Sequence, residues 1–293
     1  MPFKAETVLM KRLWGGQKLK KYNKQFGEEK IGESWETDKD MMPVLIKLID
    51  AEELLSVQVH PNDEMAEMLE HQRAGKTEAW VVLECSPGAE LIAGLKEGVG
   101  PRDVMEALEK NKLQGLLRTV KVKRGDCIYI PAGTIHSLGK GIVVYEVQQP
   151  SDVTYRLYDW NRLDATGKPR ELHVDKALCC IDYRLPPVSI DNLYEQSIKP
   201  LEGCKLFENE YFATDYMYCR KYQKQSFQTK AFTAVTLISG SLWIYHEGEK
   251  TLLQKGDTWI VEEAGIQVNL QALESTELLI TENRSTAEIL QLD

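Results

Sequence analysis

The sequence predicts a protein dominated by antiparallel β-structure, folded as barrels or sandwiches. Short apolar runs of the length typical of strands recur at close intervals along the chain. Between residues 120 and 158 these runs are separated by tight turns at Gly125, Gly133, Gly139 and Gly141. Closely spaced strands joined by glycine turns favour an antiparallel sandwich or barrel over a doubly wound parallel sheet.

The first part of the chain combines strands with a helical insertion. Residues 43–60 contain two apolar runs split by a short polar connection, which predicts two strands. Residues 62–73 predict a short helix capped by Asn62 or Asp63. Residues 101–118 carry apolar side chains at helical spacing and predict a helix inserted between strands. Further strands are predicted at 78–84, 89–93, 120–122, 127–130, 142–147 and 153–158.

The chain is predicted to form two domains. A less regular stretch, with a possible helix at 172–180, ends at Pro186 and Pro187, which break the chain. We therefore predict a first domain at residues 1–185, with the helical insertion near 101–118, and a second all-β domain at 186–293.

A short stretch of sequence in the first half of the chain resembles one in the second half. Residues 123–130 (KRGDCIYI) resemble residues 254–261 (QKGDTWIV). Counted from the shared Gly-Asp pair, the position of His136 falls on Gln267. This similarity suggests a duplicated barrel whose second copy lacks the histidine.

Composition excludes several classes of protein. The net charge of −9 argues against a nucleic-acid binder, although a locally basic pocket could still accept an anionic small molecule. No apolar stretch reaches the roughly 18 to 20 residues of a membrane span, and the N-terminus does not resemble a signal peptide. Six cysteines without CxxC spacing predict reduced thiols, so we expect a cytoplasmic protein.

Four polar residues form a candidate metal site. Gln58 and His60 alternate in an apolar run and would share one face of a strand. Glu78 opens the next strand-like run, and His136 follows the turn at 131–133. Two imidazoles, a carboxylate and an amide oxygen suit zinc, with manganese, iron or cobalt as alternatives. Without a thiolate ligand, a closed structural zinc site is not expected.

Two other features have both a structural and a functional interpretation. Residues 31–36 bring together two carboxylates, a hydroxyl and an indole, which either pack irregularly or form a pocket wall for a polyhydroxylated ligand. Lys47 interrupts an apolar strand and is either an outward-facing residue or a buried cation with a function.

The spacing of residues 125–136 resembles the second motif of the cupin superfamily. Glycine, proline, glycine and histidine follow one another at that motif's intervals, but Lys140 stands where an asparagine is usual. In the first motif, Gln58-Val59-His60 replaces the usual pair of histidines, and Glu78 follows after a longer gap. This variant resembles the type I mannose-6-phosphate isomerases in their short bacterial form.

The resemblance covers four motifs in the family's order between about residues 55 and 160. It implies two cupin-like jelly-roll barrels, the second degenerate and without metal ligands. It also implies one zinc ion per chain. The implied metal ligands are Gln58, His60, Glu78 and His136. The implied catalytic residues are Arg156, Lys76 and Glu146, and Arg156 alternates with Thr154 and Tyr158 on one predicted strand face.

The reaction implied by the resemblance is isomerisation of mannose 6-phosphate to fructose 6-phosphate through an enediol. Glu146 is the first candidate for the base that moves the proton from C2 to C1. Lys76 or Arg156 would stabilise negative charge or hold the phosphate of the hexose 6-phosphate. The alternatives are a metal-bound sugar-phosphate sensor without turnover and an iron-dependent cupin oxygenase. The sequence leaves the oligomeric state open.

Overall fold

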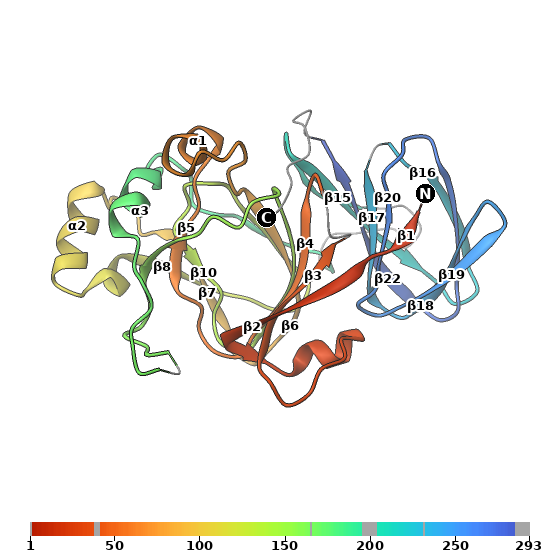
Figure 1. The fold of residues 1–293 in the computed structure, drawn as a ribbon, viewed down its shortest axis with the longest axis horizontal. Helices are drawn as coiled ribbons and strands as arrows, with labels where there is room; N and C mark the ends of the chain where they lie inside the picture. Colours follow the sequence, from red (N-terminus) through yellow and green to blue (C-terminus); the bar gives the residue numbers. More distant parts are fainter. Residues whose placement is uncertain (1, 38–41, 165, 195–203, 231, 285–293) are drawn as a thin grey trace.

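Antiparallel strands dominate the regular secondary structure of the computed structural model, as the sequence predicted (Figure 1). The structure describes residues 2–37, 42–164, 166–194, 204–230 and 232–284. Strands in these ranges form four sheets, which pair into two barrels. In Figure 1 the second barrel consists of the blue part of the chain and the red strand β1, and most of the rest, from red to green, forms the first barrel.

The first barrel consists of a seven-stranded and a five-stranded sheet. The seven-stranded sheet has the order β13 (Ile190–Asn192), β9 (Asp126–Ile130), β6 (Glu78–Cys85), β11 (Ile142–Gln148), β4 (Leu45–Ala51), β3 (Ile31–Thr37) and β2 (Glu6–Gly16). The five-stranded sheet has the order β12 (Tyr155–Tyr158), β5 (Val57–Val59), β10 (His136–Ser137), β7 (Glu90–Leu95) and β8 (Leu117–Lys121).

The second barrel consists of a six-stranded and a four-stranded sheet. The six-stranded sheet has the order β1 (Phe3–Lys4), β20 (Thr258–Val261), β17 (Thr233–Ser239), β22 (Thr276–Asn283), β15 (Phe212–Cys219) and β14 (Cys204–Glu208). The four-stranded sheet has the order β16 (Lys224–Gln228), β21 (Gln267–Ala272), β18 (Ser241–His246) and β19 (Glu249–Gln254).

The described residues contain three α-helices, namely α1 (Asp63–Glu70), α2 (Pro101–Glu109) and α3 (Val174–Cys180). Of these, α2 and α3 lie at the end of the first barrel that is remote from the second, while α1 lies above the first barrel (Figure 1). The predicted helix at 101–118 is shorter than expected, because Asn111 adopts a left-handed conformation and only a 3-10 turn, Leu113–Leu116, precedes β8. Asn62 caps α1 by accepting a hydrogen bond from the Met65 amide. In the described ranges, no helix has the length and apolar character that crossing a membrane requires.

Strand β11 separates two cores. Tyr145 and its alternate neighbours pack into a cluster that also contains Phe212 and Leu279 of the second barrel. Val144 belongs instead to the cluster inside the first barrel. Because side chains alternate along a strand, Glu146 shares the face of Val144 and points into the first barrel. The second barrel therefore supports the rear face of the strand that carries Glu146.

The predicted division at residues 185 and 186 stays a prediction. Two strand pairings cross it. Strand β1, at the start of the chain, pairs with β20 of the second barrel. Strand β13, which follows the predicted boundary, pairs with β9 of the first barrel. Each barrel thus includes an edge strand from the other side of the predicted boundary, namely β1 in the second barrel and β13 in the first.

Candidate active site and metal centre

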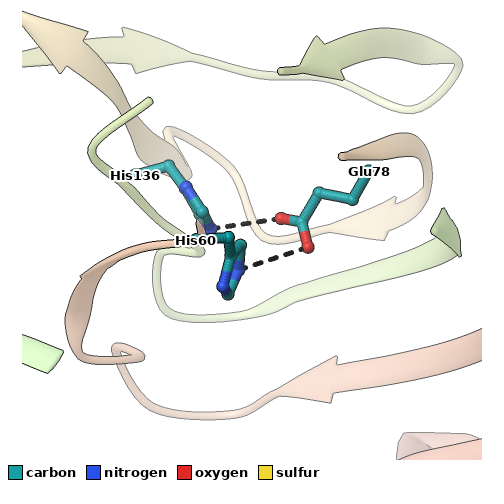
Figure 2. Close-up of side chains that lie close together, drawn as sticks. All are labelled: His60, Glu78 and His136. Atoms are coloured by element: carbon teal, nitrogen blue, oxygen red, sulfur yellow. Dashed lines mark ion pairs between the residues drawn. The ribbon is translucent and has the colours of Figure 1, made fainter. Parts of the chain in front are cut away.

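Three of the predicted metal ligands form a buried cluster (Figure 2). His60 Nε2 lies 3.4 Å from Glu78 Oε2, and His136 Nε2 lies 3.1 Å from Glu78 Oε1. All three side chains are at most 1% exposed. The Glu78 carboxylate points between the two imidazole rings, as Figure 2 shows.

Strand pairing brings these residues together from distant parts of the sequence. His60 directly follows β5, Glu78 begins β6 and His136 begins β10. In the ladder between β10 and β5, His136 lies opposite Gln58. The Gln58 amide nitrogen is 3.3 Å from His136 Nε2, so the fourth predicted side chain lies beside the cluster. It faces His136 with its nitrogen and not with the oxygen that would bind a metal, so its role as a ligand stays a prediction.

The donor atoms of the cluster fit a divalent metal ion. His60 Nδ1 lies 2.8 Å from the Val153 carbonyl oxygen, and His136 Nδ1 lies 2.9 Å from the Thr134 carbonyl oxygen. An Nδ1–H that donates to a carbonyl turns the Nε2 lone pair toward the cluster, where it can bind a metal. His60 Nε2 and both Glu78 oxygens are buried and make no hydrogen bond within the described part of the chain, although Lys76 Nζ forms an ion pair of 3.1 Å with Glu78 Oε2. Converging, buried acceptors of this kind are a suitable cage for a cation.

The charge states of the ligands also suit metal binding. Burial, together with the charge of Lys76, lowers the pKa of His60 to about 3, so its imidazole is neutral. Burial alone would raise the pKa of Glu78, but Lys76 and the two histidines outweigh it and hold that pKa well below its usual value. Metal ligands must be deprotonated, and both groups already are near neutral pH.

A cavity of about 320 Å³ opens beside the cluster. Its wall includes Gln58 and the three predicted catalytic residues, namely Lys76, Glu146 and Arg156. This volume lies in the range of about 300–1,000 Å³ that small-molecule sites occupy. The wall also carries charged residues that the sequence reasoning did not assign to the site, namely Arg12, Asp152 and Arg170.

Glu146 has the environment of a base with a tuned pKa. Trp80 Nε1 donates a hydrogen bond of 2.7 Å to Glu146 Oε2, and Lys47 Nζ lies 3.6 Å from Oε1. Burial and the nearby Glu78 carboxylate raise the pKa of Glu146, and Lys76, Lys47 and the Trp80 hydrogen bond oppose them. A raised pKa suits a carboxylate that must take up and release a proton.

Lys47 is a buried cation and not an outward-facing strand residue, which was the other of its two predicted interpretations. Its side chain is 2% exposed, and its Nζ lies 3.2 Å from Asp152 and 3.9 Å from Glu33. Glu33 also forms an ion pair of 2.7 Å with Arg12. Because Glu33 lines the cavity, the segment 31–36 contributes to the pocket wall. Glu36 of the same segment instead pairs with Lys24.

Arg156 lies at a basic end of the cavity. Its Nη1 donates to the Glu171 carbonyl oxygen at 2.7 Å, and its Nε is buried without a hydrogen-bond partner among the described residues. Burial and the neighbouring Arg170 lower the pKa of Arg156. Arg170 is held by Asp159, which accepts from its Nε at 2.7 Å. Two guanidinium groups thus face the cavity close together.

The prediction that Thr154, Arg156 and Tyr158 share one face of a strand is only partly correct. Thr154 and Arg156 both line the cavity. Tyr158 instead accepts a hydrogen bond from Gln114 and packs edge-on against Trp160. The register of β12 against β5 shifts between Arg156 and Tyr158, which breaks the simple alternation.

Comparison with known proteins identifies close relatives. A family model described as the phosphomannose isomerase type I catalytic domain matches residues 7–78. The mannose-6-phosphate isomerase ManA of Bacillus subtilis is 35% identical in an alignment that covers 72% of this chain and 78% of the relative. A mannose-6-phosphate isomerase of Streptococcus mutans is 30% identical in an alignment that covers 89% of this chain and 92% of the relative. A crystal structure of the Bacillus subtilis mannose 6-phosphate isomerase superimposes with a TM-score of 0.86 at 28% identity, and the match covers 96% of this chain and 99% of that one.

Proposed function

Because the chain belongs to the type I mannose-6-phosphate isomerase family, we propose that it interconverts mannose 6-phosphate and fructose 6-phosphate with one bound divalent metal ion. Zinc is the first candidate, since imidazole and carboxylate donors suit it. The observation that supports this proposal most directly is the buried cluster of His60, Glu78 and His136 beside a charged cavity.

Four residues of the chain would hold the metal, namely Gln58, His60, Glu78 and His136. When bound, the metal would supply Lewis-acid stabilisation of negative charge on a substrate oxygen. Lys76, whose Nζ lies 3.1 Å from Glu78 Oε2, adds a fixed positive charge next to the same place. Burial would lower the pKa of Lys76, but Glu78 and Glu146 outweigh it and raise that pKa, so this charge is permanent.

Glu146 acts as the base of the proposed reaction. Its carboxylate removes the proton from C2 of the open-chain aldose, and the C1 carbonyl oxygen takes up the negative charge. A proton then moves from the C2 hydroxyl to the C1 oxygen through the enediol. The same carboxyl group returns its proton to C1, and the C2 oxygen is left as the ketone. Trp80 and Lys47 keep Glu146 oriented toward the cavity throughout.

The basic end of the cavity holds the phosphate of the substrate. Arg156 and Arg170 both line it, and the planar guanidinium fork matches two phosphate oxygens. The buried Arg156 Nε, which has no hydrogen-bond partner in the described part of the chain, is a free donor for one of them. The sugar then extends from this end toward Glu146 and the metal cluster.

Removal and return of the metal test the proposal. We expect protein stripped with a chelator to lose turnover of mannose 6-phosphate, measured by a coupled assay for fructose 6-phosphate. One equivalent of zinc should restore it, and metal analysis should find one ion per chain. Full activity in protein shown to be free of metal would contradict the metal-dependent reaction.

A further inference from the structure

The segment 75–78, which carries Lys76 and Glu78, is held against the segment that carries His60. The Lys76 amide donates to the Pro61 carbonyl oxygen at 2.9 Å. The two backbones are so close that a Cβ on Gly75 would lie 2.4 Å from the Asn62 carbonyl carbon. Small displacements of this segment would therefore change the distance between His60 and Glu78 directly.

Gln149 fixes the middle of this segment. It follows β11, is 3% exposed, and its amide donates to the Thr77 carbonyl oxygen at 3.1 Å. Its side-chain Oε1 accepts from the Thr77 amide at 2.8 Å. Gln149 therefore binds both backbone groups of the residue between Lys76 and Glu78. The Thr77 hydroxyl also accepts from the Ala132 amide at 3.3 Å, which connects it to the turn before His136.

Asp63 connects Gln149 to the second barrel. Gln149 Nε2 donates to Asp63 Oδ1 at 2.8 Å, and the Gly75 amide donates to the same oxygen at 2.7 Å. The other oxygen, Asp63 Oδ2, accepts a hydrogen bond of 3.2 Å from the Tyr211 hydroxyl. Tyr211 directly precedes β15 of the second barrel. Three hydrogen-bonded side chains thus run from the second barrel to the backbone beside Glu78.

We propose that Gln149 and Asp63 are positioning residues for Glu78, and that the second barrel braces them through Tyr211. This inference rests on the proposed metal site. None of the three side chains belongs to the four proposed ligands, and each acts through the backbone of the segment 75–78. Residues that orient metal ligands typically change metal affinity by about 10- to 100-fold when removed. The second barrel, which lacks the ligands, would then contribute to metal binding in the first.

Zinc binding by the full-length protein tests the inference. Affinity is measured by competition with a chromophoric chelator, and kcat, KM and thermal unfolding are measured in parallel. We expect Gln149→Ala to weaken zinc binding about tenfold and to lower kcat more than it changes KM. Asp63→Ala should behave in the same way. Asp63→Asn keeps the oxygen that accepts from Gly75 and Gln149, and its new amide group can donate to the Tyr211 hydroxyl oxygen, so it should stay close to wild type.

Tyr211→Phe tests the role of the second barrel with a milder change. We expect it to weaken zinc binding about two- to threefold, as the loss of one partly buried hydrogen bond would. The matched control is Tyr245→Phe, whose hydroxyl is bonded to Gln271 within the second barrel and should leave zinc affinity unchanged. If Gln149→Ala proves too unstable to purify, Tyr211→Phe and the two Asp63 variants still decide the question.

A further variant, His136→Ala, separates the two proposals. If His136→Ala binds zinc as tightly as wild type, the proposed metal site is wrong. If His136→Ala loses zinc but Gln149→Ala and Asp63→Ala keep wild-type affinity while unfolding at lower temperature, the three residues are only structural. That second outcome would overturn this inference and leave the proposed function intact.

Discussion

The two barrels have the same strand order but different interiors. Strands β9, β6, β11, β4 and β3 of the first barrel correspond in order to β20, β17, β22, β15 and β14 of the second. Strands β5, β10, β7 and β8 correspond to β16, β21, β18 and β19. One edge agrees as well, since β13 beside β9 corresponds to β1 beside β20, whereas the edge strands β2 and β12 of the first barrel have no counterpart in the described part of the second. The chain therefore contains one architecture twice.

The two similar segments, residues 123–130 and 254–261, form the same turn in both barrels. Gly125 and Gly256 have φ values of 87° and 91°. The Gly125 amide donates to the Val82 carbonyl oxygen, and the Gly256 amide donates to that of Leu237. Each following aspartate accepts from a backbone amide three residues earlier, at 2.8 Å in both cases. The two barrels thus share the chemistry of this turn, although the proposed metal ligands all lie in the first.

The interiors differ at the positions that carry the proposed chemistry. Glu78 lies opposite Ile130, whereas the matching pair in the second barrel is Thr233 and Val261. Glu146 lies opposite Trp80, and the matching strand position holds Ile280, opposite Val235. His136 is buried, whereas the side chain of Gln267 is exposed. A shared fold therefore does not imply a shared site, because a few side chains decide it.

Removing the histidine from one barrel and its counterpart from the other should give the largest contrast. We expect His136→Ala to lower kcat by at least about 10³-fold, since a metal supplies several kcal/mol of charge stabilisation. Gln267→Ala should leave kcat and zinc content at wild-type values. The measurements are steady-state turnover and metal content per chain. Equal losses in both variants would show that the second barrel takes part in the chemistry.

The next contrast concerns the proposed base. Glu146→Gln keeps the shape of the side chain but cannot accept the C2 proton, so we expect kcat to fall about 10²- to 10⁴-fold. The corresponding change in the second barrel, Ile280→Val, should cost about 1 kcal/mol of stability and no activity. Exchange of the C2 proton with solvent deuterium, followed by NMR, reports the step itself. Wild-type exchange in Glu146→Gln would exclude Glu146 as the base.

Sequence patterns predicted the parts of this site that depend on local spacing. The alternation of Gln58 and His60 and the turn before His136 both led to side chains that the structure brings together. Lys47 and Asp152 could not be assigned, because their contact joins residues 105 positions apart and depends on strand order. A charged residue in an apolar strand has no partner until the sheet is known. The roles of all these residues stay predictions until they are tested.

A third contrast compares a buried tryptophan in each barrel by its effect on the pH dependence of kcat. Trp80 donates a hydrogen bond to Glu146, which favours the ionised carboxylate and lowers its pKa. In Trp80→Phe that pKa should rise, so the acid limb of the kcat profile should move to higher pH, and the plateau should fall less than in Glu146→Gln. Trp259→Phe, at 2% exposure in the second barrel, makes the same change in size. It should lower stability by about 1–2 kcal/mol without moving the limb. A limb that is unchanged in Trp80→Phe would show that Glu146 does not control it.

The smallest effect on catalysis is expected at the turn that the barrels share. Alanine at a left-handed position costs about 1–2 kcal/mol, so Gly125→Ala and Gly256→Ala should both destabilise the protein. At Gly125 the new Cβ would lie 2.4 Å from the ring of Tyr194, which is 46% exposed and can rotate away. At Gly256 it would lie 1.9 Å from the backbone carbonyl oxygen of Tyr22, which cannot.

Gly256→Ala should therefore lower the unfolding midpoint more than Gly125→Ala, and both should keep the wild-type kcat at a temperature where they are folded. Thermal unfolding and turnover of the two variants test this order. A larger loss at Gly125 would mean that the packing around the two turns, and not only the interior of the barrels, has diverged. The expected order instead means that the turn tolerates an added side chain least in the second barrel. There the N-terminal segment, through Tyr22, packs directly against Gly256.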